Sequence, residues 1–181
     1  MHNIVNLKKI LPLKLDRTQL DLLTYKDIDW YINTIKTPFF NEYIDYKFLD
    51  VTDTELKFKL TNLAMSYSLN MRISGEARLI LRDKVSGDKI GGCTLFESDN
   101  TSLEIGYWIL PAYQNKGYAK ELMSNIIEQL FKLKNIKVIR LVIREDNFKS
   151  IMLAEKCGFS KSGSFIGKYK ENLVYEVRQL K

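Results

Sequence analysis

Residues 103–119 read LEIGYWILPAYQNKGYA, and this stretch decides the fold. Its first half, up to Leu110, is rich in β-branched and aromatic residues, which favours a β-strand. Pro111 cannot donate a hydrogen bond to a ladder, so we expect the strand to end there. From Ala119 onwards, apolar residues recur at steps of three and four, which predicts an amphipathic helix of about four turns. The stretch therefore predicts a strand, a short loop and a helix.

The loop that enters this helix has the composition of an anion-binding site. The first turn of a helix presents backbone N–H groups without partners and the positive end of the helix dipole, which together suit a diphosphate. Gly117 has no Cβ and the Ala119 side chain is small, so the backbone can approach a ligand closely. Lys116 adds a positive charge.

Two common nucleotide-binding motifs are missing from the same loop. A Walker P-loop needs two glycines and a Gly-Lys-Ser/Thr ending, and a dinucleotide fingerprint needs Gly-x-Gly-x-x-Gly. Neither pattern occurs around Gly117. ATP and NAD are therefore disfavoured as ligands.

The remaining sequence alternates strand-like and helix-like segments without a repeat or a flexible linker. Asp27 is an expected N-cap for a first short helix, and Pro38 is expected to end that helical region. Mixed strand order of this kind requires helices on both faces of a sheet, which predicts an α/β (α+β) sandwich formed by one domain over residues 1–181. The expected strands cover 20–25, 77–82, 89–96, 102–110, 137–144 and two tail segments around 170–172, and the further helices cover 54–74, 119–133 and 150–157.

Composition excludes several classes of protein. The chain has 181 residues, 45% of them hydrophobic, and no apolar run long enough to span a bilayer, so we expect no membrane partner and a cytoplasmic location. Because His2 is the single histidine, neither a histidine metal site nor a Ser-His hydrolase triad can form, and no metal is predicted. Cys93 and Cys157 lie in apolar stretches, which favours reduced, buried thiols.

Two motifs together resemble those of the GNAT acetyltransferase superfamily. The pattern Gln-x-x-Gly-x-Ala after Glu-Ile-Gly-Tyr-Trp resembles its acetyl-CoA-binding motif, and Asn147-Phe148-Lys149-Ser150 with 155–159 is similar to its second cofactor segment. The resemblance covers residues 102–160 and is greatest to the branch that contains ribosomal-protein alanine N-acetyltransferases. It implies a GNAT-like mixed sheet in which two parallel strands, here 102–110 and 137–144, splay apart.

The resemblance also implies where acetyl-CoA binds. The pantetheine arm would lie between the splayed strands and pair with the backbone, as an added strand pairs with a sheet edge. Asn147 would bond the pantetheine or cap the helix that follows it, and Tyr118 would either stack near the cofactor or pack in the core. The strand residues implied are Trp108, Ile109 and Leu110, and the diphosphate residues are Gln114, Asn115, Lys116, Gly117, Tyr118 and Ala119.

The implied reaction is direct attack of a primary amine on the thioester, in a ternary complex. Glu104 would accept the proton of the amine, although a surface or salt-bridged carboxylate is an equal alternative. Many members use a tyrosine to protonate the leaving thiolate, but the corresponding residue here is Ala154. Ser150, four residues earlier, would supply the hydroxyl instead, or would simply be the N-cap of its helix.

The acceptor and the partners stay open. A protein N-terminus, for example that of a ribosomal protein, and a small-molecule amine both suit the chemistry. The missing tyrosine leaves a second class open, a non-catalytic CoA-binding module, and the net charge of +6 leaves a third, a ribosome- or RNA-associated protein. Basic residues are spread along the chain, so a nucleic-acid partner is not expected. A homodimer is compatible with this reading. The acceptor pocket is expected between residues 31–74 and 165–175, which include the aromatic residues Tyr43, Tyr46 and Phe48.

Overall fold

One eight-stranded sheet organises the protein. The computed structural model describes residues 7–42, 51–69, 75–133, 135–168 and 170–179. The strand order is β1-β2-β3-β4-β5-β6-β8-β7, and each neighbouring pair is antiparallel except β5 and β6, which are parallel. The strands are β1 (Leu13–Lys14), β2 (Thr18–Leu22), β3 (Glu76–Asp83), β4 (Lys89–Asp99), β5 (Ser102–Ile109), β6 (Val138–Arg144), β7 (Ser160–Ile166) and β8 (Glu171–Arg178).

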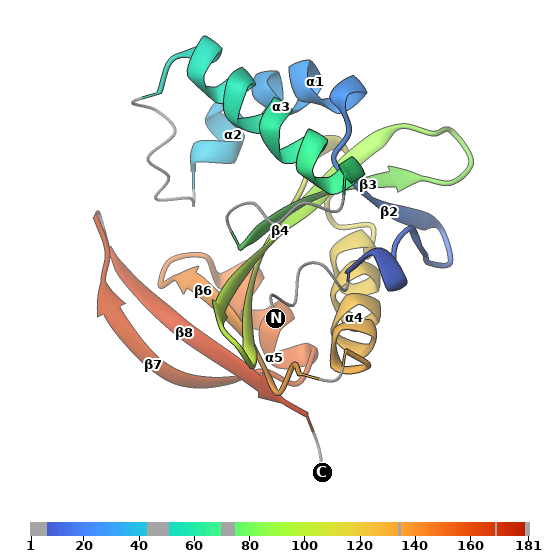
Figure 1. The fold of residues 1–181 in the computed structure, drawn as a ribbon. Helices are drawn as coiled ribbons and strands as arrows, with labels where there is room; N and C mark the ends of the chain where they lie inside the picture. Colours follow the sequence, from blue (N-terminus) through green and yellow to red (C-terminus); the bar gives the residue numbers. More distant parts are fainter. Residues whose placement is uncertain (1–6, 43–50, 70–74, 134, 169, 180–181) are drawn as a thin grey trace.

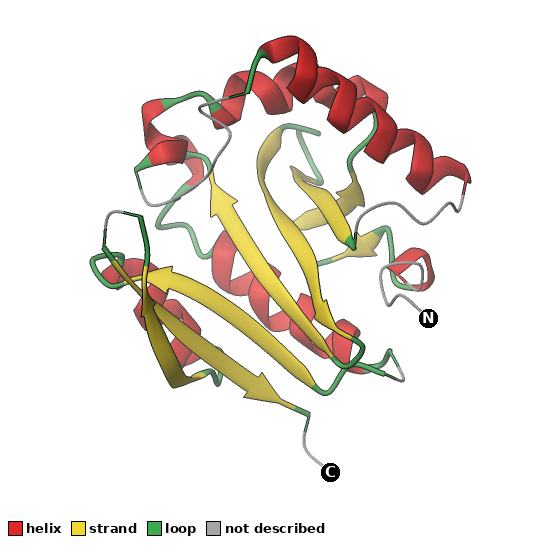
Figure 2. Cartoon of the chain, turned by 60° about the vertical axis from the view of Figure 1, so that its left-hand side comes forward, coloured by secondary structure: helices red, strands yellow, loops and turns green. Residues whose placement is uncertain are grey.

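Helices cover both faces of the sheet, as Figures 1 and 2 show. Helices α1 (Ile28–Ile35), α2 (Pro38–Asn41) and α3 (Asp53–Leu69) lie on one face, and α4 (Tyr118–Phe131) and α5 (Phe148–Lys156) lie on the other. Two short 3-10 turns, Tyr25–Asp27 and Pro111–Tyr113, introduce α1 and the loop before α4. The predicted mixed sheet with helices on both faces is confirmed.

Alternation along β5 assigns its side chains to two separate cores. Leu103, Ile105 and Ile109 belong to the cluster under α4 and α5, and Tyr107 packs against it. Trp108 is 8% exposed and belongs to the cluster under α1, α2 and α3, where its ring meets those of Trp30, Tyr31 and Phe40. On β4, a Cβ at Gly92 would lie 3.0 Å from that indole ring and 2.5 Å from the Leu79 carbonyl, so only glycine fits there.

Several local expectations differ from the structure. Asp27 makes no side-chain cap for α1; its carboxylate instead accepts hydrogen bonds from the Thr24 backbone and hydroxyl and pairs with Arg82 and Lys89. Burial alone would raise the pKa of Asp27, but these partners outweigh it and lower the pKa to about 2. Pro38 opens α2 rather than ending a helix, because proline suits the first helical position.

Most element boundaries match the predictions. The expected strand 20–25 begins earlier, as β2 over Thr18–Leu22, and the two-residue β1 had not been predicted. The helix expected over 54–74 is confirmed over Asp53–Leu69, while residues 70–74 lie outside the described residues. Tyr43, Tyr46 and Phe48 also lie outside them.

The two parallel strands pair at one end and separate at the other. Their register joins Ser102, Leu103 and Glu104 to Val138, Ile139 and Arg140, and no pairing follows between the later residues of β5 and β6. From Leu141 to Arg144, β6 continues to pair with β8 alone. The predicted splay is therefore present, and it opens directly after Glu104.

Candidate active site

The loop before α4 is shaped as a nest of backbone N–H groups. Asn115 has φ 60° and Gly117 has φ 82°, so two left-handed residues alternate with Lys116 between them. Successive residues of this kind turn their N–H groups toward one side and form an anion-binding concavity. Gly117 suits its conformation because it has no Cβ, whereas Asn115 tolerates it as a short polar residue.

The first turn of α4 extends this nest. Its first helical hydrogen bond runs from the Glu121 N–H to the Gly117 carbonyl, so the N–H groups of Tyr118, Ala119 and Lys120 have no acceptor within the helix. The helix dipole adds partial positive charge at the same point. The main chain here fits a diphosphate, as the sequence predicts.

The side chains of the loop mostly stabilise its shape. The Gln114 amide donates to the Ile109 carbonyl at 3.0 Å, which ties the loop to the end of β5. The Lys116 ammonium donates to the Ala112 carbonyl at 2.9 Å and lies over the Tyr113 ring. Tyr118 packs against Tyr113. These side chains therefore stabilise the shape of the loop, whereas the N–H groups of the nest come from its backbone.

Arg17, which precedes β2, lies across the same loop. Its Nη1 donates to the Lys116 carbonyl at 2.9 Å, its Nε donates to Glu121 at 2.8 Å, and its guanidinium stacks 4.4 Å from the centre of the Tyr118 ring. A Cβ on Gly117 would lie 3.5 Å from Nη2. Sequence analysis missed Arg17 because about 100 residues separate it from the loop, and no local pattern marks it.

Arg17→Gln is expected to weaken CoA binding about threefold to tenfold and to lower stability by about 1–2 kcal/mol. The change removes a cation beside the nest and the donor that holds the Lys116 carbonyl. Calorimetric titration with CoA and thermal melting measure both effects. Lys132→Gln is the matched control, since Lys132 is an exposed cation just past the other end of α4, paired only with Glu128. Equal CoA affinities for the two variants would contradict the assignment of Arg17.

The backbone N–H groups of β5 that point into the gap between β5 and β6 differ in part from those predicted. The Leu110 N–H donates to the Ile90 carbonyl on β4, so it cannot bind pantetheine, and the prediction for Leu110 is wrong. In the antiparallel register Trp108 faces Gly92, and alternation directs its backbone groups toward β4 as well. The direction of the N–H groups alternates along the strand. Those of the intervening residues Ile105, Tyr107 and Ile109 therefore point away from β4 and toward the gap. Of the three predicted residues, Ile109 has its N–H on the side of the gap, and its binding to pantetheine stays a prediction.

Glu104 is the last paired residue of β5, at the closed end of the gap. It shares a face with Trp108, so it lies on the side of the sheet opposite α4 and α5. Burial raises the pKa of Glu104. Arg140, which pairs with Glu104 from β6, lowers that pKa by a smaller amount. Within the described residues the Glu104 carboxylate forms no hydrogen bond or ion pair, and Arg140 pairs with Glu176 at 2.8 Å instead. A salt-bridged surface carboxylate is therefore not what the structure shows.

The start of α5 resolves one alternative for Ser150. The N-cap of α5 is Asn147, whose side-chain oxygen accepts the Ser150 N–H at 3.2 Å, so Ser150 is not the cap. Tyr107 of β5 packs on the same side of the sheet as α5, and burial raises its pKa to about 12 against a smaller lowering by Ser150. Ser150 is the third residue of α5, on the face of the sheet that α4 and α5 cover, and its role as the acid stays a prediction.

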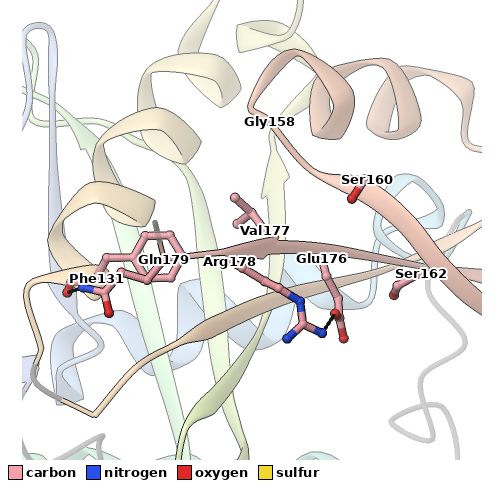
Figure 3. A pocket seen from close by; sticks show the side chains of 8 residues that line it. All are labelled: Phe131, Gly158, Ser160, Ser162, Glu176, Val177, Arg178 and Gln179. Carbon is pink, nitrogen blue, oxygen red and sulfur yellow. Dashed lines mark hydrogen bonds and ion pairs between the residues drawn. The ribbon is translucent and has the colours of Figure 1, made fainter. Parts of the chain in front are cut away.

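An open pocket of about 750 Å³ lies at the other end of the molecule from the nest (Figure 3). It is lined by the ends of α4, α5 and β8 and by the start of β7, and Arg178 and Glu176 form an ion pair beside it at 2.7 Å. Because Phe131 is the last residue of α4 and the nest precedes its first, the length of the helix separates the two sites. The lining residues are Phe131, Gly158, Ser160, Ser162, Glu176, Val177, Arg178 and Gln179.

The described residues contain neither a cluster of metal-ligating side chains nor a helix suited to a membrane. No group of three or more histidine, cysteine, aspartate or glutamate side chains among them could hold a metal ion. No helix in that part of the chain combines the length and the apolar character needed to cross a bilayer.

One curated relative is Spermidine N(1)-acetyltransferase of Vibrio cholerae. It is 28% identical to this chain over 112 residues, which cover 61% of this chain and 64% of the relative. The aligned part thus spans just under two thirds of that protein. A second relative, the uncharacterized N-acetyltransferase YnaD of Bacillus subtilis, is 39% identical over 62 residues, or 34% of this chain and 36% of the relative.

Solved structures share the fold along almost the whole chain. The crystal structure of spermidine N-acetyltransferase from Vibrio cholerae with CoA and spermine has a TM-score of 0.76 at 23% identity and covers 90% of this chain and 96% of its own. Ribosomal-protein-S5-alanine acetyltransferase from Vibrio fischeri has a TM-score of 0.73 at 18% identity, with 92% and 95% covered. The family model described as the acetyltransferase (GNAT) domain matches residues 17–160, and the chain therefore belongs to the GNAT acetyltransferase family.

Proposed function

We propose that the protein is an N-acetyltransferase that transfers the acetyl group of acetyl-CoA to a primary amine. The observation that carries this proposal is the alignment of three features along β5. These are an anion nest after its end, an unpaired edge along its second half, and the half-buried carboxylate of Glu104 where the edge begins. Together they suit the diphosphate, the pantetheine arm and the attacking amine, in that order.

Binding would use the main chain more than side chains. The nest and the first turn of α4 would hold the diphosphate, and the N–H groups of Tyr107 and Ile109 face the gap where the pantetheine and thioester carbonyls would lie. A preorganised N–H beside the thioester carbonyl stabilises the negative charge that develops on its oxygen during attack. Holding the amine against the thioester supplies much of the remaining acceleration.

Two side chains would handle the protons. Glu104 accepts the proton of the attacking amine, directly or through a water, and its raised pKa makes it a stronger base than an ordinary glutamate. Ser150, on the first turn of α5, would place its hydroxyl near the sulfur and donate to the thiolate as the C–S bond breaks. A covalent route through a cysteine is disfavoured, because burial raises the pKa of both the Cys93 and Cys157 thiols.

The acceptor would approach from the face that carries Glu104. A Cβ at Gly106 would meet no atom within 4 Å, so the space above β5 is unfilled two residues after Glu104. Arg140 and the exposed Val142 of β6 alternate onto the same face. The names of the relatives include acetyltransferases of spermidine, aminoglycosides and ribosomal proteins, which favours an amine and leaves its class to experiment.

An amine panel tests the proposal. Purified protein with acetyl-CoA is offered spermidine, spermine, an aminoglycoside and peptides with N-terminal alanine or serine, and CoA release is measured together with the mass of the product. We expect acetylation of at least one of these amines. Tight acetyl-CoA binding without turnover on any amine would favour a non-catalytic CoA-binding module. RNA binding that falls steeply with salt, in the absence of CoA binding, would favour the ribosome- or RNA-associated alternative.

A further inference from the structure

Gly106 is a solvent-exposed glycine in the middle of a central strand. It lies on β5 between Glu104 and Trp108, on the face of the sheet that carries α1, α2 and α3. A glycine weakens the interior of a strand, because it has no side chain to pack and loses more conformational freedom on folding than other residues. The φ of Gly106 is outside the left-handed region that favours glycine, so backbone geometry does not account for this residue.

Close packing does not account for Gly106 either. On the neighbouring strand β4, a Cβ at Gly91 would lie 2.5 Å from the Trp108 carbonyl oxygen, so no larger residue fits there. A Cβ on Gly106 would meet no atom of the described residues within 4 Å. The folded protein has room for a side chain at this position, and a strand glycine of this kind points to a ligand that approaches the main chain closely.

The space above Gly106 is open on the side of the gap. Thr94 is the partner of Gly106 on β4, whereas no β6 residue pairs with it, because the pairing of β5 with β6 ends at Glu104. The Trp108 indole turns toward β4, where it would lie 3.0 Å from a Cβ on Gly92. The space above Gly106 therefore adjoins the gap, two residues beyond Glu104.

The two faces of β5 differ in the room that they leave beside the gap. On the face of α4 and α5, Ile105 and Ile109 are buried and Tyr107 packs against the same core. On the opposite face, the position between these residues is Gly106, which is exposed. A thioester bound along the gap is attacked from one face or the other, and the face of Gly106 is the one with room for an amine. The Glu104 carboxylate lies on this same face.

We propose that Gly106 is a specificity-determining residue: its bare main chain forms the floor of the acceptor subsite, and the carbon that bears the reacting amine lies against it. This inference rests on the proposed acetyl transfer and names the residue that sets how much room the acceptor has. Glu104 lies on one side of the amine and Trp108 on the other. A side chain at position 106 would occupy the place of the amine, which accounts for a glycine despite its cost to the strand.

Filling this space stepwise tests the proposal in turnover. We expect Gly106→Ala to raise the KM for the best amine of the panel about tenfold, and Gly106→Val to lower kcat/KM for that amine by about 100-fold. The Kd for CoA of Gly106→Ala, measured by calorimetric titration, should stay within about twofold, because the nest is unchanged. The melting temperature should equal or exceed that of the unchanged protein, since both residues suit a strand better than glycine does.

Gly163→Ala is the matched control. Gly163 is also an exposed strand glycine whose Cβ would meet no atom of the described residues within 4 Å, but it lies at a register shift on the edge strand β7. This variant should leave both the KM for the amine and the Kd for CoA unchanged. An ordinary KM for the amine in Gly106→Val, or equal losses of amine and CoA affinity in Gly106→Ala, would overturn the proposal.

Amine binding separates this assignment from the reaction itself. Each amine of the panel is titrated calorimetrically into the complex of the protein with CoA, and we expect Gly106→Val to abolish the binding. If no amine is acetylated but one binds and Gly106→Val removes that binding, the proposed acetyl transfer fails and the subsite stands. If the unchanged protein binds no amine of the panel, or Gly106→Val binds one equally well, the subsite is not above Gly106.

Discussion

Gly117→Val is expected to weaken the binding of CoA by about 100-fold or more while the protein stays folded. At φ 82° an L-residue is strained, and a β-branched side chain more than most, by about 1–2 kcal/mol. The chain would relieve this strain by leaving the left-handed region, which turns the nest N–H groups away from the diphosphate. Loss of one or two charge-assisted hydrogen bonds adds about 1.5–3 kcal/mol each, and 1.4 kcal/mol is a factor of ten in affinity.

Gly158→Val provides the matched control for this result. Gly158 follows α5 with φ 86°, and a Cβ there would meet nothing within 4 Å, so the backbone strain is similar but lies away from the nest. We expect both variants to lose comparable thermal stability and only Gly117→Val to lose CoA affinity in a calorimetric titration. CoA binding of ordinary strength by Gly117→Val would show that the diphosphate is held elsewhere.

Local patterns predicted most of the fold. The turn residues around Gly87, the β-rich run before Pro111 and the periodicity of α4 each have a cause within a few residues, and the structure confirms each element. Asp27 stands at the predicted N-cap position of α1, but its carboxylate makes no capping bond because it pairs with Arg82 and Lys89, which the pairing of distant strands brings near it. The two-residue β1 carries too little pattern to be recognised before β2 is placed beside it.

The site was predictable where it is made of main chain and less so where side chains from separate elements meet. The motif at 114–119 located the nest, although the left-handed Asn115 was not foreseen. Which of Trp108, Ile109 and Leu110 turns its backbone N–H toward the gap depends on the register between β5 and β4. A change of one residue in that register would reverse the pattern. Arg17 was missed because its relevance arises from a contact across the fold, with Lys116.

Glu104→Gln is expected to lower kcat about 100-fold at neutral pH and to leave CoA affinity unchanged. The amide keeps the size of the side chain but cannot accept the proton of the amine, and positioned general bases contribute about 10²–10⁴-fold. Steady-state kinetics with the best amine of the panel measures the effect. Glu128→Gln is the control, since Glu128 is an exposed carboxylate on α4 that pairs only with Lys132. Turnover of ordinary rate by Glu104→Gln would assign the base to another group.

The pH profile identifies the base independently of rate. Because only the ionised carboxylate accepts a proton, kcat/KM should rise with pH through the pKa of Glu104, which burial holds above its ordinary value. Glu104→Gln should lose this rise, whereas a rise that comes from the amine itself persists in the variant. Arg140 lowers the pKa of Glu104, so Arg140→Gln should move the rise to higher pH. A rise that stays in place in both variants would mean that the carboxylate at the closed end of the gap takes no proton from the amine.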